Sequence, residues 1–390
     1  MPFTEMSIMD QRLEFVRLAS VEGANRRELC RRYGISADTG YKWLGRYGEG
    51  QGDLSDRSRR PLSSPARSSV EIEQAVVAVR SEHPAWGARK IGALLRREGL
   101  QVPAPSTVHA ILARQGCIEP PAGGARATGR FEREAPNSLW QMDFKGWIRT
   151  SDGRQLHPLT VVDDHSRFSV CLEACVDQTA QTVKSRLERV FARYGLPEAF
   201  FVDNGSPWGD SGGGNWTRFG VWLLKLGVDV LHSRPYHPQG RGKNERFHRT
   251  LDAEVLALRP LRDAAHAQNA FDAWRNVYNQ KRPHEALAME VPATRYAPSP
   301  RALPEKLAEP EYDSQDVVRR VGKTKDYVAF KGRLWKVPMA FRGETVAIRP
   351  LQDDGQFGVY FASHQIASID LTQNQTVSHV SEQVSTMSPG

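Results

Sequence analysis

The sequence is poor in cysteine and contains no long apolar run. Only four of its 390 residues are cysteines, and Cys30, Cys117, Cys171 and Cys175 form no CxxC pair and lie near no histidine pair at zinc spacing. The sequence therefore supports neither a disulfide framework nor a zinc finger, and free thiols in a reducing cytoplasm are expected. No segment approaches the roughly 18 apolar residues of a membrane span. The opening residues, MPFTEMSIMDQRLEF, also lack the apolar core of a secretory signal.

Positive charge is concentrated at the two ends of the chain. Lys and Arg number 53 against 45 Asp and Glu, which gives a net charge of +8. Residues 1–130 hold 20 basic and 14 acidic residues, and residues 317–350 hold nine basic residues opposed only by Asp326 and Glu344. This distribution favours DNA-binding ends around a middle part that carries carboxylates and uses a metal. Ordinary solvated faces would give the same surplus, so both interpretations stay open.

The first 48 residues have the pattern of a helix-turn-helix domain. Apolar spacing predicts helices over 8–22, 25–33 and 37–47, with Asn25 and Ser36 as caps and a tight turn at 34–36. In such a domain the third helix enters the major groove. A generic three-helix bundle would show similar spacing. The candidate DNA-contacting side chains are Arg26, Arg27, Thr39, Lys42 and Arg46.

A second trihelical unit is predicted at residues 70–118. Its helices are expected over 70–81, 87–98 and 106–115, the last capped by Ser106. Residues 49–69 and 119–136 are polar linkers rich in Gly, Ser, Pro or Arg. The candidate DNA contacts here are Arg59 and Arg60 in the first linker, where a solvated tether is the simpler interpretation, and Arg89, Lys90, Thr107 and His109 in the helical unit.

The middle of the chain is predicted to be an α/β layer with a mixed sheet. The predicted strands are 139–145, 156–163, 168–176, 199–203 and 228–231, and the predicted helices are 179–194, 217–226 and 243–258. Asp143 lies in the first strand, and Asp203 ends a later one, where such sheets place their ligand sites. Glu245 begins the last helix, opposite an apolar stripe formed by Phe247, Leu251, Val255 and Leu258.

These three carboxylates are candidates for a metal site. Ligand sets made only of oxygen favour Mg²⁺ or Mn²⁺, and two ions about 3.5–4 Å apart are suited to phosphodiester chemistry. A rival pair, Asp163 and Asp164, precedes HSR between two strands and is better explained as a hairpin turn. Trp208 either packs over the site or stacks on DNA, and both remain open. His237 is equally compatible with a substrate contact and with a surface position.

Four segments carry a family resemblance. WQMDFKG (140–146), FVDNGSPWG (201–209), PYHPQGRGKNERFHRTL (235–251) and YNQKRPHEALAMEVPATRY (278–296) resemble DDE transposases of bacterial insertion sequences, which share the retroviral-integrase catalytic core. The resemblance implies an RNase H-like fold for residues 137–297. It also implies that Asp143, Asp203 and Glu245 are the catalytic, metal-binding triad, with Mg²⁺ or Mn²⁺, two ions per site, as cofactor.

The same resemblance implies a function and partners. We expect binding to terminal repeats, strand cleavage and transfer of the 3′-hydroxyl into double-stranded target DNA. The chain is expected to act as a homo-oligomer, at least a dimer, in the bacterial cytoplasm at the nucleoid, without a membrane. Lys243, Arg246 and Arg249 flank Glu245 and are expected to meet phosphates, although helix support is the alternative. The chain departs from the family in its 41 residues between Asp203 and Glu245 and in Asp252, where a Lys is common.

The C-terminal part is predicted to be all-β. A Pro-rich spacer, 298–316, precedes short β-branched and aromatic runs over 317–372, which predict a small SH3-like barrel that binds DNA or another protein. Residues 373–390 are expected to be disordered. The predicted fold class is thus multidomain: all-α helix-turn-helix units, an α/β RNase H-like core and a small β-barrel. Two alternative functions are a catalytically weak, transposase-derived DNA-binding protein and a nuclease that cuts without joining.

Overall fold

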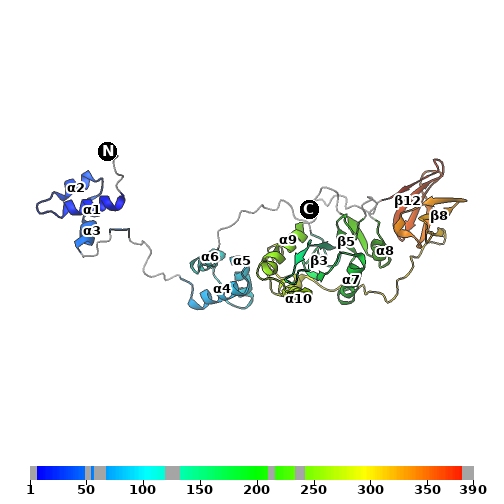
Figure 1. The fold of residues 1–390 in the computed structure, drawn as a ribbon, viewed down its shortest axis with the longest axis horizontal. Coiled ribbons are helices and arrows are strands. Elements are labelled where there is room, and N and C mark those ends of the chain that lie inside the picture. Colours follow the sequence, from blue (N-terminus) through cyan, green and yellow to red (C-terminus); the bar gives the residue numbers. More distant parts are fainter. Residues whose placement is uncertain are drawn as a thin grey trace. The chain divides into compact units, whose positions relative to one another are not determined.

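The computed structural model describes residues 7–48, 54–56, 67–118, 132–209, 216–232 and 242–379 (Figure 1). The chain divides into two compact units, residues 1–67 and 68–390, and each is described by itself. The boundary falls inside the linker predicted at residues 49–69. No helix in the described ranges is both long and apolar enough to cross a bilayer.

The first unit is the predicted trihelical domain. It contains α1 (Ile8–Ala19), α2 (Arg26–Arg32) and α3 (Ala37–Gly48), packed around a cluster that includes Phe15, Cys30 and Trp43. The expected caps are present: Asn25 accepts the Glu28 amide (3.1 Å), and Ser36 Oγ accepts the Thr39 amide (3.1 Å). These side chains satisfy amides that a helix start leaves unpaired, which is why the boundaries follow the sequence signals.

The second unit begins with another trihelical bundle, formed by α4 (Val70–Glu82), α5 (Ala88–Arg97) and α6 (Pro105–Arg114). Trp86 and Ile91 lie in its core. The predicted Ser106 cap is wrong, because α6 starts at Pro105 with Ala104 as N-cap and no side-chain cap bond. Proline fixes its own φ near the helical value and needs no amide partner at the first helical position.

The bundle also contacts the α/β core, which the sequence did not predict. The Arg97 guanidinium donates to the Lys281 carbonyl (2.8 Å). Val277 of the core helix α10 (Ala264–Gln280) packs against the bundle's apolar cluster. The bundle is therefore docked on the core by one hydrogen bond and one apolar contact at least.

The core contains a mixed sheet, as predicted. Its order is β2-β3-β1-β5-β6, with β4 paired to β3. Strand β1 runs antiparallel to β3 and parallel to β5, and β5 runs parallel to β6. The strands are β1 (Trp140–Phe144), β2 (Ile148–Arg149), β3 (Gln155–Asp163), β4 (Ser169–Cys175), β5 (Ala199–Val202) and β6 (Asp229–His232).

Helices cover both faces of this sheet (Figure 1). Trp140 and Met142 of β1 point to the cluster shared with α7 (Ala180–Tyr194) and α8 (Arg218–Lys225). The opposite face, which carries Val162 of β3, packs against α9 (Gly242–Leu251) and α10. Cys171 and Cys175 are buried, as expected for core residues. This layering puts α9 on the sheet face where Gln141 and Asp143 point, since successive strand residues alternate.

Two features of the core differ from the expected helices. Helix α9 ends at Leu251 and continues as a π-helix, Asp252–Leu256, so the regular stripe stops and Leu258 is 51% exposed. Helix α10 was not predicted. Its Gln268 and Asn279 side chains exchange hydrogen bonds with the backbone of β4 (2.8–3.1 Å), which covers that strand edge.

The C-terminal domain is an antiparallel sheet, and the predicted barrel is not confirmed. Within the described residues the sheet is open, with order β13-β12-β11-β10-β7, beside a β8-β9 ribbon. Strand β13 (Gln375–Ser378) lies in the segment predicted to be disordered, so that prediction is wrong there. The strands before it are β7 (Val317–Arg320), β8 (Tyr327–Phe330), β9 (Arg333–Lys336), β10 (Thr345–Pro350), β11 (Gln356–Phe361) and β12 (His364–Asp370).

This domain is joined to the core by shared packing. Trp216, Val221 and Leu224, at and within α8, belong to the same apolar cluster as the β-domain core. The Lys225 ammonium lies 2.6 Å from a Glu344 carboxylate oxygen, and the Trp216 indole donates to the His379 carbonyl (2.6 Å). The domain is therefore packed against the core through α8, in addition to its covalent connection through residues 298–316.

Candidate active site

Asp143 and Asp203 lie at the carboxyl ends of neighbouring parallel strands. The register of β1 and β5 pairs Trp140 with Phe200 and Gln141 with Phe201. The same offset, continued by two residues, places Asp143 level with Asp203. Strand alternation turns the Asp143 side chain away from the face of Trp140, toward the face that carries α9, while Asp203 begins the loop after β5. The expected convergence of these two acids is consistent with the register.

Asp203 is held by its own loop. Its Oδ1 accepts the Gly205 amide (2.9 Å) and the indole N–H of Trp208. Trp208 is only 2% exposed, and its ring stacks on Phe144 with the centroids 5.5 Å apart. The His232 imidazole is paired with the Asp203 carbonyl (3.0 Å). Of the two roles left open for Trp208, the structure supports packing beside the site, because a buried ring has no face for DNA.

Asp143 is tied to α9 through β3. The Thr160 hydroxyl donates to the Asp143 carbonyl (2.9 Å), and the His248 Nε2 atom lies 2.9 Å from the same hydroxyl oxygen. Thr160 is fully buried and faces Asp143 across the β1–β3 pairing. The Asp143 backbone is thus connected to a helix that begins 99 residues later, at Gly242.

Glu245 is carried by helix α9 and not by the sheet. It lies in the first turn of α9 and is exposed. Among the described residues, no three His, Cys, Asp or Glu side chains are grouped closely enough to hold a metal ion. The structure therefore shows two acids at the same level and the third on the helix covering their sheet face. The donors are all carboxylate oxygens, a set that fits Mg²⁺ or Mn²⁺ by its chemistry.

Lys243 does not face outward as expected of a DNA contact. Its ammonium lies 2.5 Å from the Oδ1 atom of Asp164, whose side chain is fully buried. Burial is the largest cause that lowers the pKa of Lys243, to about 8, while the Asp164 charge opposes the shift. In this structure Lys243 forms an internal ion pair with Asp164, and its phosphate contact stays a prediction. Arg246 and Arg249, on the same helix, are exposed.

The rival pair, Asp163 and Asp164, forms the predicted turn between β3 and β4. Asp163 accepts the Asn137 amide (2.7 Å) and the Ser166 amide and hydroxyl (2.7 and 2.5 Å). Asp164 accepts the Arg133 amide (2.9 Å) and the Gln141 side-chain amide (2.7 Å). The Asp163 carboxylate thus holds the turn together, whereas the Asp164 carboxylate joins the turn to residues outside it.

Asp252, where the family commonly carries Lys, is also paired. Its carboxylate lies 2.7 Å from the ammonium of Lys145, which follows β1 two residues after Asp143. The positive charge near this part of α9 is therefore supplied from the sheet and balanced by Asp252.

The candidate DNA-binding residues of the first unit fall into two groups. Arg27 and Lys42 are exposed on α2 and α3. The others make internal contacts: Arg26 donates to the Ala19 carbonyl (3.1 Å), the Thr39 hydroxyl pairs with Ser36, and Arg46 lies over Trp43 and donates to the Ser55 carbonyl. Arg59, Arg60 and His237 lie outside the described residues.

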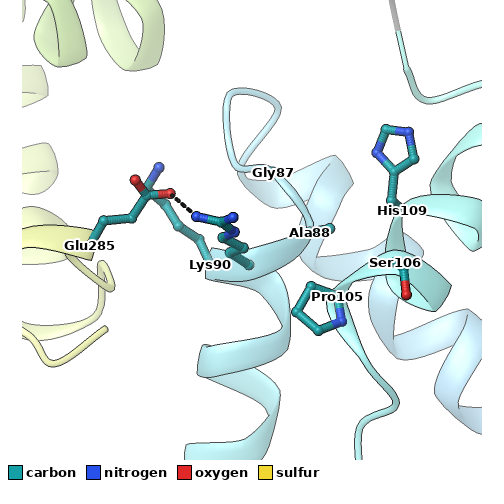
Figure 2. Close-up of a pocket in the computed structure, with 8 residues that line it drawn as sticks. Gly87, Ala88, Lys90, Pro105, Ser106, His109 and Glu285 are labelled. Carbon is teal, nitrogen blue, oxygen red and sulfur yellow. Dashed lines mark ion pairs between the residues drawn. The ribbon is translucent and has the colours of Figure 1, made fainter. Parts of the chain in front are cut away.

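Three of the four candidates in the second bundle, Arg89, Lys90 and His109, line one groove of about 430 Å³ (Figure 2). Arg89 and Lys90 come from the first turn of α5, and Ser106 and His109 from α6. Arg89 is 3.8 Å from Glu285 of the core, and burial lowers the pKa of Lys90. Thr107 is half-buried on α6 beside them. The starts of α5 and α6 and the side chains of Arg89, Lys90 and His109 line this groove, and they make it compatible with a phosphate.

Three residues around the acids were missed by sequence reasoning. They are Gln141, Thr160 and His248, and their roles follow only from strand register and from the packing of α9 on the sheet. A weak signal existed, since Gln141 and Asp143 occupy alternate positions of one strand and Thr160 interrupts an apolar one. No spacing rule could have joined them to His248.

Domain families match most of the described chain. Two integrase core domain families match residues 133–238 and 226–292, and the C-terminal domain of IS481 family transposases matches residues 316–377. A helix-turn-helix domain family matches residues 11–61, and a homeodomain-like family matches residues 39–112. These matches agree with the helix-turn-helix units and with the integrase-like core.

Similar proteins come from insertion elements and retroviruses. A protein of insertion element IS407 from Burkholderia multivorans is 27% identical over 59% of this chain and 82% of its own length. A protein of IS476 from Xanthomonas euvesicatoria is 26% identical over 60% of this chain and 66% of its own length. A Gag-Pol polyprotein of baboon endogenous virus is 26% identical over 53% of this chain and 12% of the polyprotein.

Solved structures overlap only loosely. A chain of the simian T-cell lymphotropic virus intasome covers 74% of this chain and 96% of its own length, with 17% identity and a TM-score of 0.35. The HTLV-2 integrase catalytic core domain in complex with magnesium covers 42% and 97%, with 14% identity and a TM-score of 0.31. The matched domain families and insertion-element relatives identify this chain as a bacterial insertion-sequence transposase of the DDE type with an integrase-type core.

Proposed function

We propose that this chain cleaves one strand at each end of an insertion sequence and transfers the freed 3′-hydroxyl into target DNA. The triad would be Asp143, Asp203 and Glu245, with Mg²⁺ or Mn²⁺ as cofactor. The observation that carries this proposal is the β1–β5 register, which, continued by two residues, puts position 143 level with position 203 at one edge of a sheet that packs against the helix of Glu245. Two carboxylates at this edge are where an α/β sheet binds ligands.

The chemistry consists of two in-line displacements at phosphorus. In the first, a water oxygen bonds to the phosphorus at the element end and the bond to the 3′-oxygen breaks, which leaves a 3′-hydroxyl. In the second, that hydroxyl bonds to a target phosphorus and displaces the target's own 3′-oxygen. Divalent ions, when bound, activate the attacking oxygen and stabilise the leaving one. The three carboxylates would hold those ions, two per site in our proposal.

Glu245 must join the aspartates for this chemistry. It is exposed at the start of α9, and residues 233–241 before it lie outside the described residues. We infer that metal and DNA together bring the Glu245 carboxylate to the pair formed by Asp143 and Asp203. Negative phosphates and divalent cations offset the repulsion among three carboxylates, which disfavours their close approach without ligands.

The helix-turn-helix units would recognise the terminal repeats, with Lys42 and Arg27 exposed in one unit and the groove of Arg89 and His109 in the other. Phosphate contacts from both units would give strong salt dependence. Arg246 and Arg249 would contact DNA beside the triad. Each element end needs one active site, so we propose a homo-oligomer, at least a dimer, as the working form.

A catalytically weak, transposase-derived DNA-binding protein is the alternative. It is favoured by Asp252, which stands where the family commonly carries a DNA-contacting Lys and which is neutralised by Lys145. The same pairing also fits the transposase, because Lys145 keeps a cation near the acids. The two functions differ in one property, metal-dependent cleavage.

The test uses end-labelled DNA that carries the repeats flanking the coding region. The full chain is incubated with this DNA and Mg²⁺, and nicked and joined products are separated on a gel. We expect both products from the wild type, none from Asp143→Asn, and normal amounts from Asp354→Asn, an exposed acid of the C-terminal sheet. Binding without nicking would favour the alternative, and nicking without joining would indicate a nuclease.

A further inference from the structure

Two chains of polar contacts connect α9 to strand β1, and the first passes through the buried Asp164. The Lys243 ammonium donates to Asp164 Oδ1 (2.5 Å). The side-chain amide of Gln141 donates to the same oxygen (2.7 Å). Asp164 has no exposed side-chain surface, and Lys243 retains about a sixth of its own. The first turn of α9 is thereby attached to position 141 of β1.

The second chain passes through the buried Thr160. Its hydroxyl donates a hydrogen bond to the Asp143 carbonyl (2.9 Å). Its oxygen must therefore accept the hydrogen bond that it shares with His248 Nε2, 2.9 Å away. A hydroxyl has a single proton, and a carbonyl has none to give. The His248 ring therefore carries a proton on Nε2. The second turn of α9 is thereby attached to position 143 of β1.

The two chains stand on either side of Glu245. Lys243 precedes it by two residues and His248 follows it by three, which is less than one helical turn on each side. Their end points, Gln141 and Asp143, are alternate residues on one face of β1. The helix turn that carries Glu245 is therefore held at both sides to the strand that carries Asp143.

We propose that Lys243 and His248 are positioning residues that set Glu245 relative to Asp143, acting through Asp164 and Thr160. This inference rests on the proposed function, because Glu245 needs a fixed place only if it shares ions with Asp143. None of the four touches substrate in this assignment.

Apolar packing alone would not supply this precision. Phe247 and Leu251 bury α9 against the sheet, but such contacts are non-directional and tolerate small rotations of a helix. Hydrogen bonds and a buried ion pair are directional, and buried polar groups become costly when a shift leaves them unpaired. A polar pair on each side of Glu245 therefore selects one rotation of α9.

The test exchanges Thr160 for two matched residues in the full chain. Thr160→Val keeps the shape and removes the hydroxyl, whereas Thr160→Ser keeps the hydroxyl. Hydrogen–deuterium exchange of peptides that cover α9 is measured without metal or DNA. We expect exchange in α9 to become about tenfold faster in Thr160→Val, with little change in Thr160→Ser and none in α7. His248→Phe, which removes the donor from the other end, is the second variant should Thr160→Val fold poorly.

The Mg²⁺ concentration that gives half-maximal nicking is the second measurement. We expect it to rise several-fold in Thr160→Val and to be restored in Thr160→Ser. Unchanged exchange in α9 overturns the proposal, whatever the activity. Faster exchange with an unchanged Mg²⁺ requirement overturns the positioning role, since the contacts would then hold the helix only. If the wild type does not nick DNA at all, the proposed function fails and the role of positioning for catalysis fails with it, while exchange still reports whether the contacts fix α9.

Discussion

The indole N–H of Trp208 donates to the Oδ1 atom of Asp203, while the ring of the same Trp208 stacks on Phe144. Phe144 directly follows Asp143 and ends β1, so the buried Trp208 side chain connects the end of β1 to Asp203, at the start of the loop after β5. The bridge fixes the direction of the Asp203 carboxylate and the spacing of the two strand ends. It also explains why a tryptophan sits five residues after Asp203.

Trp208→Phe is expected to reduce nicking. Phenylalanine retains the stacking on Phe144 but lacks the indole donor, so the Asp203 carboxylate loses one of two hydrogen bonds to Oδ1. We expect the nicking rate to fall about tenfold, equivalent to one lost charge-assisted hydrogen bond, with the melting temperature nearly unchanged. Single-turnover gel assays and thermal unfolding measure both. Trp147→Phe, at a 59% exposed tryptophan, serves as control, and equal rates for the two variants would contradict the role of Trp208.

Glu254→Gln is expected to destabilise the core. The Glu254 carboxylate, in the π-helix after α9, accepts from Arg282 Nε (2.8 Å) and from the Trp274 indole (2.9 Å), and both members of the ion pair are about nine-tenths buried. Removing one charge leaves the other buried and uncompensated, which costs roughly 3–5 kcal/mol of unfolding free energy.

Urea unfolding followed by circular dichroism measures this loss. The matched control is Glu188→Gln, on the surface of α7, where the nearest ammonium is 3.9 Å away and only a small change is expected. A Glu254→Gln protein with the wild-type midpoint would show that the buried pair does not stabilise the core.

The cysteines are expected to react in a fixed order. Burial raises the pKa of Cys171 well above its usual range and that of Cys175 to about 11. Since the thiolate is the reactive form, both stay protonated as well as inaccessible at pH 8. Half-buried Cys117 should react first with a thiol reagent, and all four thiols should react after unfolding in guanidinium. Rapid labelling of Cys171 in the native chain would contradict the packing of β4.

Lys42→Ala is expected to weaken DNA binding mainly at low salt. Lys42 is exposed on α3, where one phosphate contact contributes about 0.9 to the slope of log affinity against log salt. The slope should therefore decrease by about one unit in magnitude, as measured by fluorescence anisotropy at several salt concentrations. Lys306→Ala, at an exposed lysine before the C-terminal domain, is the control. An unchanged slope for Lys42→Ala would remove α3 from the interface.

Local signals in the sequence predicted most element positions. Caps such as Asn25 and Ser36 act over a few residues, and α2 and α3 start where these residues indicate. The predictions failed where distant parts decide. Strand β13 depends on pairing with β12, and the π-helix after α9 carries Glu254, whose partner Arg282 lies far along the chain.

In the candidate site, too, local motifs were predictable and contacts between distant residues were not. The acids 143, 203 and 245 were found because motifs surround them, and strand positions 143 and 203 indicated one sheet edge. Lys243 was expected to bind phosphate because it lies two residues before a proposed catalytic Glu, and the sequence does not reveal its ion pair with the buried Asp164. Asp164 lies in the turn between β3 and β4, far from Lys243 in sequence, and only the fold brings the two residues together.

The most direct test of the central claim is the cleavage rate of Glu245→Gln on terminal-repeat DNA in Mg²⁺, measured beside Glu188→Gln. Glu245 is the one proposed ligand that a helix carries instead of the sheet, so its requirement decides whether three acids act together. We predict a loss of at least about a hundredfold for Glu245→Gln, with DNA affinity retained, and wild-type cleavage for Glu188→Gln. Cleavage by Glu245→Gln within twofold of the wild type would contradict the proposed triad.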